Sequence, residues 1–110
     1  MGKYDHELYH IKAEFCKTLA DPTRQMMISE LREGEKTVGE IAEAIEILQS
    51  MTSHHLAILR SRGVVKARRE GANVYYSLVN PKITEACDMV HDILISQMAK
   101  NRELADRIIS

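Results

Sequence analysis

The stretch QSMTSHHLAILRSRG, residues 49–63, constrains the fold more than any other part of this chain. It contains an apolar stripe at helical spacing, bordered by His55, and the members of the stripe are Met51, Leu56 and Leu59. The stretch ends in a glycine, which commonly terminates helices. The pattern predicts a helix that packs this stripe inward and exposes polar side chains in its first two turns.

The side chains expected to be exposed at the start of this helix are Gln49, Ser50, Thr52, Ser53 and His54. Small donors and acceptors at the N-terminal end of an exposed helix suit base edges and phosphates in the major groove of double-stranded DNA. A capped surface helix has the same composition, because serine and threonine favour helix N-caps. The flanking segments decide between these two interpretations.

Length and composition favour a single domain over residues 1–110, because 110 residues with 45% hydrophobic side chains suffice for one modest core. No apolar run approaches membrane-spanning length, and the start MGKYDHELYH lacks the apolar centre of a signal peptide, so we expect no membrane partner. The two cysteines lie far apart in the sequence and form no disulfide framework, which favours a cytoplasmic location.

Charge is unevenly distributed along the chain. The segment 49–82 holds six lysine and arginine side chains and one glutamate, a formal charge of +5, although the net charge of the whole chain is −1. A basic middle within an acidic chain is the electrostatic footprint of a nucleic-acid-binding face.

Helices are expected at about 4–20 and 22–33. The first has a broad apolar face, which suggests burial against a partner subunit. The second starts at Asp21-Pro22, an N-cap residue followed by a proline in the first helical position. Gly34 is expected to end it in the left-handed conformation.

A third short helix is expected at about 37–45, opened by the capping box of Thr37 and Glu40. A tight turn then leads into the helix at about 49–62. Two short helices joined in this way, the second with an exposed polar start, are typical of a helix-turn-helix. The turn lacks the glycine often found there.

Residues 64–78 are expected to form a β-hairpin, because β-branched and aromatic residues alternate on both sides of the turn EGAN. An arginine-rich hairpin directly after the second helix is typical of a wing that reaches phosphates or the minor groove. The candidate DNA contacts of this region are Arg60, Arg68, Arg69 and Asn73. Arg68 and Arg69 alternate faces, so at most one should reach a given phosphate; the alternative is a solvated hairpin whose charges blunt its edge.

A last helix is expected from about 80 to 107, starting at Asn80-Pro81. Its apolar stripe is too wide for so small a domain to cover. Pairing of the first and last helices of two copies would cover it, which predicts a two-fold homodimer. The expected fold class is therefore mainly α with a β-hairpin: a winged helix-turn-helix, dimeric through its first and last helices.

These elements resemble the ArsR/SmtB family of winged-helix bacterial and archaeal repressors. The resemblance covers roughly residues 15–100 and rests on LADPTR at 19–24, IAE at 41–43, QSMTSHHL at 49–56 with LR at 59–60, GVV at 63–65, and RREG at 68–71 followed by VYY at 74–76. It implies a homodimer that represses transcription at a palindromic operator and releases the DNA when an inducer binds. His54 stands where many members of the family have arginine.

The residues with which members of the family sense inducers are missing at their usual places. The Cys-x-Cys of arsenite and lead sensors corresponds to Thr37-Val38-Gly39, the zinc-site positions hold Asn80, Lys82, Ile93 and Ser96, and the sulfur-sensing cysteines correspond to Ser29 and Ile95. Lysine repels zinc and isoleucine offers it no ligand.

Cys16 and Cys87 are expected on the inner faces of the first and last helices, with His91 one turn after Cys87. A disulfide or a soft-metal site is one hypothesis for these residues, which makes thiol oxidation or a metal ion a candidate inducer. The alternative is that both cysteines are small buried hydrophobes. No other cofactor is implied.

The leading hypothesis is a homodimeric, sequence-specific DNA-binding transcriptional regulator. A winged-helix module that binds protein and no DNA is the alternative, and salt dependence of DNA binding distinguishes the two. An enzyme is not expected, because the sequence has no nucleophile-and-base set at convincing spacing and no glycine-rich phosphate loop.

Overall fold

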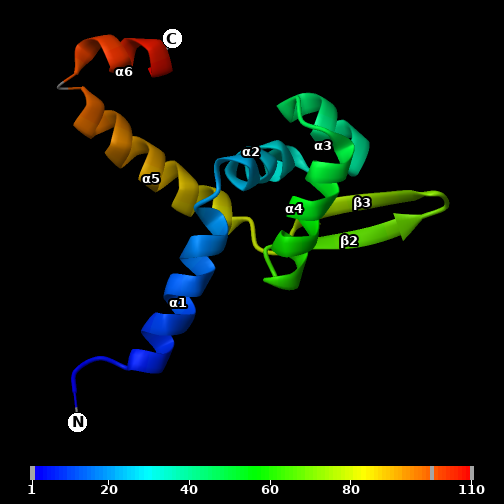
Figure 1. Ribbon diagram of the computed structural model, residues 1–110, viewed down its shortest axis with the longest axis horizontal. Coiled ribbons are helices and arrows are strands. Elements are labelled where there is room, and N and C mark those ends of the chain that lie inside the picture. Colours follow the sequence, from blue (N-terminus) through cyan, green and yellow to red (C-terminus); the bar gives the residue numbers. More distant parts are fainter. Residues whose placement is uncertain (1, 100, 110) are drawn as a thin grey trace.

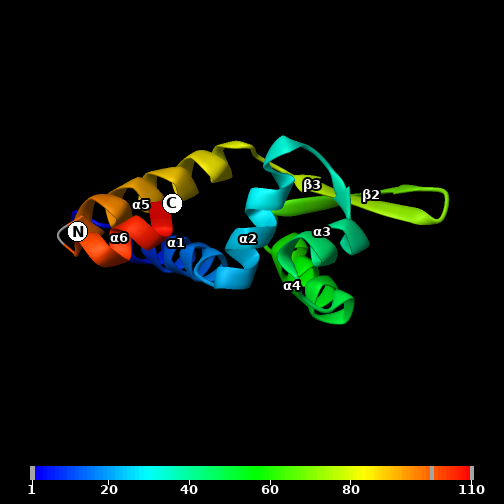
Figure 2. The same cartoon turned by 90° about the horizontal axis from the view of Figure 1, so that it is seen from above.

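The computed structural model describes residues 2–99 and 101–109, except for the side chains of 103–105 (Figure 1). In chain order its elements are α1 (His6–Leu19), α2 (Pro22–Glu30), the 3₁₀ turn η1 (Leu31–Glu33), β1 (Lys36–Thr37), α3 (Val38–Ile45), α4 (Gln49–Ser61), β2 (Val65–Glu70), β3 (Asn73–Leu78), α5 (Lys82–Met98) and α6 (Arg102–Ile109). The expected fold class, mainly α with a β-hairpin, is confirmed. Figure 2 shows α3 and α4 together on one side of the sheet.

The sheet has three antiparallel strands in the order β1-β3-β2. β2 and β3 form the expected hairpin, with Arg68 opposite Tyr75, and Gly71 turns the chain with a φ of 62° that favours glycine. β1 was not expected from the sequence, because two residues are too few to show an alternating pattern. It pairs Thr37 with Tyr75 and so joins the start of α3 to the hairpin.

The core lies between α2, α3, α4 and the base of the hairpin. Its buried members are Met27, Ile28, Leu31, Ile41, Leu56, Leu59, Val64 and Val65. These residues come from elements on both sides of the turn between α3 and α4. Burying them together therefore fixes the angle of the helix-turn-helix, and it attaches the hairpin to the end of α4.

Two of the expected helix starts are confirmed by their hydrogen bonds. The carboxylate of Asp21 accepts from the Arg24 amide at 3.1 Å, with proline in the first helical position. The Thr37 hydroxyl accepts from the Glu40 amide at 3.2 Å, and the Glu40 carboxylate accepts from the Thr37 amide at 2.8 Å. The bond from the Thr37 amide lowers the pKa of Glu40. This capping box holds the first turn of α3 in place.

The expected left-handed helix end at Gly34 is wrong. α2 stops at Glu30, and the 3₁₀ turn η1 closes the segment with a bond from the Gly34 amide to the Leu31 carbonyl at 3.3 Å. Gly34 then has φ 146° and ψ −177°. Only glycine adopts this conformation readily, and it redirects the chain into β1.

The turn between α3 and α4 has Glu46 in the left-handed conformation, with φ 58° and ψ 47°. This residue stands where a glycine is common, and it is the only non-glycine residue with positive φ in the part of the chain that the structure describes. The Ile47 amide donates to the Ala42 carbonyl at 3.1 Å and closes the end of α3. The turn thus has the usual geometry without the usual residue, at a steric cost.

The expected single helix from 80 to 107 is broken into α5 and α6. The side chain of Asn80 accepts from the Lys82 amide at 3.0 Å, but the N-cap residue is Pro81 and not the expected Asn80, and α5 ends at Met98. The Asn101 amide then bonds to the Met98 carbonyl at 2.8 Å. Asparagine is a poor helix former, and α6 turns across the end of α5 in Figure 1.

α1 and α5 both extend away from the core on the same side (Figure 2), and Figure 1 shows that their directions diverge. Both carry exposed apolar side chains, including Ile11 at 58% exposure on α1 and Val90 at 63% on α5. The broad apolar faces expected from the sequence are therefore uncovered in a single chain. Among the described helices, none is long and apolar enough to cross a membrane.

Glu46→Gly should stabilise the fold by about 0.5–1 kcal/mol, because glycine removes the left-handed strain and loses only part of that gain to unfolded-state entropy. Urea unfolding followed by far-UV circular dichroism measures the change. Glu43→Gly is the matched control: Glu43 is an exposed residue inside α3, and the same substitution there should destabilise by about 1 kcal/mol. An equal decrease in the free energy of unfolding for Glu46→Gly and Glu43→Gly would show that Glu46 is not strained.

Candidate nucleic-acid interface

α4 begins without a side-chain cap. Its N-cap position is Leu48, which is 70% exposed and offers no side-chain hydrogen bond. Ser50 and Ser53 are exposed, and neither side chain makes a hydrogen bond within the described structure. Helix capping therefore does not account for the polar residues at the start of α4, and the interpretation of this stretch as an ordinary capped surface helix does not hold.

The inward face of α4 differs from the sequence-based expectation at two adjacent positions. Met51, expected in the buried stripe, is 49% exposed, whereas Thr52, expected to face DNA, is completely buried. The Thr52 hydroxyl donates to the Leu48 carbonyl at 3.0 Å, which satisfies its polar group inside the core. With Leu56 and Leu59 it forms the inner face, so Thr52 is not available to a DNA base.

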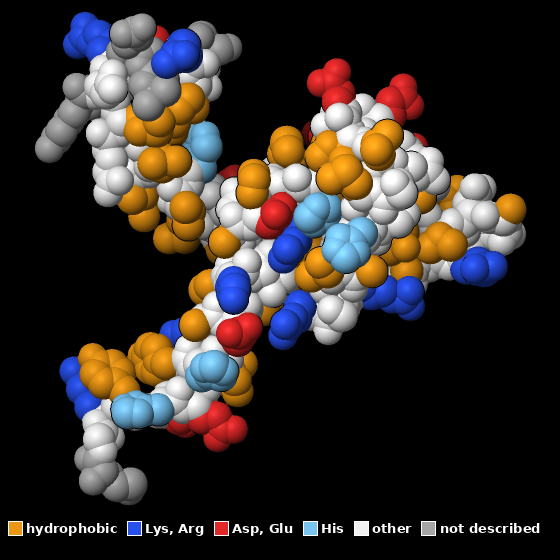
Figure 3. Space-filling model, in the orientation of Figure 1, with side chains coloured by type: hydrophobic (Ala, Val, Ile, Leu, Met, Phe, Trp, Pro, Cys, Tyr) orange, Lys and Arg blue, Asp and Glu red, His pale blue; other side chains and the backbone are white. Residues whose placement is uncertain are grey.

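The exposed face of α4 carries Ser50, Ser53 and His54 at its start and Arg60 near its end. Gln49 is also exposed, and its side chain lies beside α3, near Gly39. Figure 3 shows two neighbouring histidine side chains over α4, with lysine and arginine side chains around them and along the hairpin. The structure therefore gathers the remaining predicted contacts of α4 on one polar, partly basic face.

His55, which borders the apolar stripe of α4, has a structural role. It is half-buried, and its Nδ1 accepts a bond from the Nε of Arg24 at 3.3 Å. The same guanidinium donates to the Thr18 carbonyl at 2.9 Å. Arg24 thereby ties the end of α1 to α4. The sequence showed Arg24 only as part of a family motif and gave no sign of this bridge.

The two arginines of the hairpin are not equivalent. Arg68 donates to both carboxylate oxygens of Glu35 and to Glu70 at 2.7 Å, and it lies 4.9 Å from the centre of the Tyr75 ring. The hydrogen bonds that Arg68 donates to Glu35 and Glu70 raise the pKa of Arg68, and they lower the pKa of Glu35. Its charge is already paired with carboxylates. Glu35 was missed in the sequence because it is distant from the hairpin in the chain.

Arg69 projects from the opposite face of β2 and is exposed, with no ion pair among the described residues. Asn73 is exposed at the first position of β3, opposite Glu70 in the hairpin register. The expectation that the two arginines face opposite sides is confirmed by the strand pairing. Arg69 and Asn73 therefore remain free to contact a ligand at the end of the hairpin, whereas Arg68 braces it.

The candidate sensing residues surround a cleft of about 410 Å³ between α1 and α5, which is lined by Cys16, Leu19, Cys87, Val90, His91 and Leu94 among others. Both thiols are free; Cys87 is half-buried, and Cys16, expected on an inner face, is exposed in the single chain. Burial raises the pKa of the Cys87 thiol. Among the described residues, no group of three or more His, Cys, Asp or Glu side chains could hold a metal ion.

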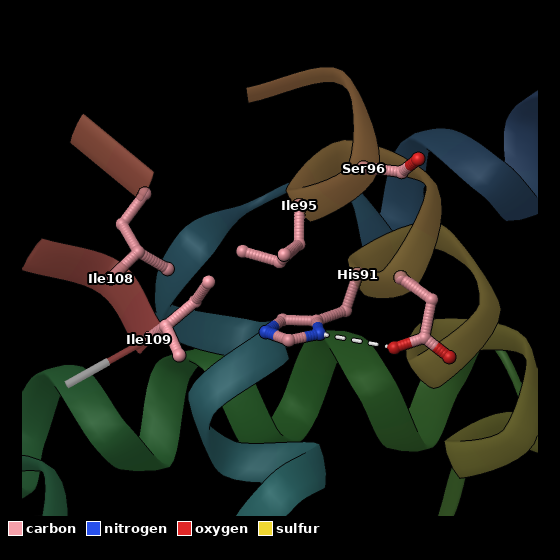
Figure 4. Close-up of a pocket in the computed structure, with 6 residues that line it drawn as sticks. His91, Ile95, Ser96, Ile108 and Ile109 are labelled. Carbon is pink, nitrogen blue, oxygen red and sulfur yellow. Dashed lines mark ion pairs between the residues drawn. The ribbon is translucent and has the colours of Figure 1, made fainter. Parts of the chain in front are cut away.

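A second apolar cleft of about 440 Å³ lies where α6 crosses α5 (Figure 4). Ile108 and Ile109 of α6 face Ile95 and His91 of α5, and His91 Nδ1 lies 3.5 Å from the carboxylate of Asp92. Both partners of this ion pair are mostly exposed, so the pair adds little to stability. His91 contributes to both clefts.

The family model that matches this chain describes bacterial regulatory proteins, and relatives that match it are named as transcriptional regulators or repressors. A sequence model described as "Bacterial regulatory protein, arsR family" matches residues 21–67, from the start of α2 into β2. The HTH-type transcriptional regulator Rv0081 of Mycobacterium tuberculosis is 38% identical over 102 residues, covering 92% of this chain and 84% of the relative. A transcriptional repressor SmtB homolog of Synechocystis is 44% identical over 82 residues, 74% of this chain and 62% of the relative.

Solved structures of transcriptional regulators have the same fold as this chain. The crystal structure of Rv0081 superposes with a TM-score of 0.73, covering 92% of this chain and 96% of that one. The homodimeric winged helix-turn-helix domain of Mb0332 from Mycobacterium bovis, 28% identical, superposes with a TM-score of 0.75 and covers 89% of this chain and 94% of that one. The relatives are named as transcriptional regulators, and the family is not one of enzymes. This chain therefore belongs to the ArsR family of bacterial regulatory proteins and is a DNA-binding transcriptional regulator with a winged helix-turn-helix fold.

Proposed function

We propose that the chain is a homodimeric repressor that binds a palindromic operator through α4 and the hairpin and leaves it when an inducer acts on α1 and α5. The observation that carries this proposal is the exposed start of α4, where Ser50 and Ser53 neither cap the helix nor bond elsewhere in the described structure. Polar groups left free on a rigid helix are available to base edges.

Each proposed contact has a chemical role. Gln49 can pair with an adenine through its amide, and Ser50 and Ser53 can donate to or accept from any base. His54, exposed beside them, adds a ring donor or acceptor but carries no charge when neutral, so it neutralises no phosphate in that form. Arg60, Arg69 and Asn73 would contact the backbone or the minor groove beside the helix.

The homodimer follows from the apolar faces of α1 and α5, which are exposed in the single chain. Large apolar faces of this kind mark interaction surfaces. The structural relative Mb0332 is described as homodimeric, which supports the same assembly here. Because a two-fold axis presents two identical copies of α4 to the DNA, the preferred operator would be a palindrome with half-sites at a fixed separation.

The proposed place of inducer action is the cleft between α1 and α5, where Cys16 and Cys87 line the same apolar space. A thiophilic inducer that engaged both thiols would fix the angle between these two helices and so change the spacing of the two copies of α4. Such thiols must be reduced to respond, which fits action in the cytoplasm. The alternative is that both cysteines are small hydrophobic residues, buried once a partner subunit covers α1 and α5.

Ser53→Ala combined with His54→Ala should weaken binding to the DNA upstream of the protein's own gene by about 1–3 kcal/mol per lost base contact, with dimerisation unchanged. Fluorescence anisotropy measures the affinity, and sedimentation the dimer. Ser29→Ala combined with His10→Ala makes the same chemical change at exposed positions of α2 and α1 and should have no effect. Unchanged affinity in the first variant would exclude α4 as the reading helix.

Arg69→Gln should weaken DNA binding more than Arg68→Gln, because the charge of Arg68 is already paired with Glu35 and Glu70. Loss of one phosphate contact per protomer should make the plot of log K against log salt less steep by about 0.9 per contact. Glu35→Gln should release Arg68 and strengthen binding. If Arg68→Gln weakened DNA binding more than Arg69→Gln, Arg68 would have to leave Glu35 and Glu70 when DNA binds.

Cys16→Ser and Cys87→Ser should each abolish release of the DNA by hydrogen peroxide or by cadmium ions, while leaving DNA affinity without these agents close to that of the parent protein. Anisotropy titrations with each agent, followed by dithiothreitol or chelator to reverse the effect, make the measurement. If both variants release DNA as the parent protein does, the cleft is not the sensing site.

A further inference from the structure

A third cleft, of about 620 Å³, differs from the other two because it is lined largely by charged side chains. It lies between the last turn of α1, the start of α2 and the second half of α4, and its polar lining includes Glu14, Lys17, Asp21, Arg24, Ser61 and Arg62. Neither the proposed base contacts nor the proposed inducer site uses this cleft.

Several of these polar groups are already engaged inside the fold. The guanidinium of Arg24 donates to Thr18 and His55, and the Asp21 carboxylate caps α2. The Ser61 hydroxyl donates to the Ile58 carbonyl at 2.8 Å. What remains are two cations, Lys17 and Arg62, for which the described structure shows no ion pair.

Neither carboxylate of the lining, Glu14 or Asp21, forms an ion pair in the described structure. Glu14 precedes Lys17 by three residues on α1, a spacing that puts the two side chains on neighbouring positions of the helix. With Arg24 counted as well, the lining carries three cations and two carboxylates, so its net charge is positive. An anionic partner would gain from Lys17 and Arg62 and be opposed by the two carboxylates.

The position of the cleft identifies a suitable anion. Ser61 is the last residue of α4 and Arg62 its C-cap, roughly 18 Å along the helix axis from Ser50. The major groove is about 12 Å wide, so a helix that reads bases with its start meets a phosphate strand near its far end. Figure 3 shows basic side chains over the end of α1 and the end of α4, on the face that carries the two histidines.

We propose that Lys17 and Arg62 contact neighbouring phosphates of the DNA backbone at the edge of the groove that α4 occupies. The inference rests on the proposed DNA contacts of α4 and extends them to α1. The cleft is open and polar, and its free donors come from long, exposed side chains. Such a surface suits a backbone held in place by other contacts and offers little to a free phosphate ion.

The extension to α1 has a structural consequence. α1 would carry a phosphate contact at Lys17 and also the apolar face proposed for dimerisation. A change in the angle of α1 would therefore move a DNA contact directly. Arg24 connects α1 to α4, because its guanidinium donates to Thr18 at the end of α1 and to His55 of α4.

The test compares the salt dependence of DNA binding between about 50 and 200 mM salt. Lys17→Gln and Arg62→Gln should each reduce the slope of log K against log salt by about 0.9 per protomer, or about 1.8 for a dimer. Lys12→Gln is the matched control, because Lys12 lies on α1 over the Tyr9 ring and does not line the cleft. Its slope should equal that of the parent protein.

Two further arms distinguish a backbone contact from a site for free anions. Glu14→Gln should strengthen binding, because it removes one of the two carboxylates in the cleft lining. Sodium phosphate and sodium chloride at equal ionic strength should inhibit equally, and selective inhibition by phosphate would indicate a free-anion site and overturn the proposal. Unchanged thermal midpoints should accompany every variant.

The outcomes separate this inference from the proposed function. A parent protein whose DNA binding shows no salt dependence would contradict both. A steep parent slope that Lys17→Gln and Arg62→Gln leave unchanged would overturn the phosphate contact alone, with α4 still the reading helix. A smaller salt slope in Lys17→Gln and Arg62→Gln, with the slope of Lys12→Gln unchanged, would support the proposed phosphate contacts.

Discussion

Burial of one side of α4 is the constraint on which the rest of this structure depends. Thr52, Leu56 and Leu59 are completely buried against α2, α3 and the base of the hairpin. Since a helix has a fixed angle of about 100° per residue, burying these three decides the direction of every other side chain on α4. The face of α4 proposed to read DNA is therefore set by core packing, and its backbone is held by the rigid core.

Local rules predicted much of this fold from the sequence. Asp21-Pro22 and the Thr37–Glu40 box mark helix starts through bonds to residues three positions away, so the information is contained in a few neighbouring residues. Such local rules did not predict that Thr52 is buried and Met51 exposed, the reverse of the expectation. Their adjacent positions are both compatible with the apolar stripe, and threonine can be buried because its hydroxyl bonds to its own helix. The roles of Glu35 and Arg24 depend on partners more than thirty residues away in the chain.

A small number of polar contacts connect α1 and α5, the helices proposed to sense an inducer, to the core around α4, the helix proposed to read DNA. Arg24 links the end of α1 to α4, and Arg32 of η1 forms a two-bond ion pair with Asp88 of α5 at 2.8 and 2.9 Å. Asp88 directly follows Cys87, and the bonds from Arg32 lower the pKa of Asp88. Of the two helices that carry the cysteines, α1 is thus connected to α4 and α5 to η1, by side chains that could transmit a change in helix orientation.

Thr37 belongs to two elements at once. It caps α3 through its side chain, and its backbone pairs with Tyr75 in the hairpin. Thr37 therefore joins the helix-turn-helix to the hairpin, so the two should move as one rigid body. If α4 and the hairpin contact DNA as proposed, the protein fixes the distance between these two contacts. DNA with a different spacing would have to deform, so the protein would also select its operator by groove width.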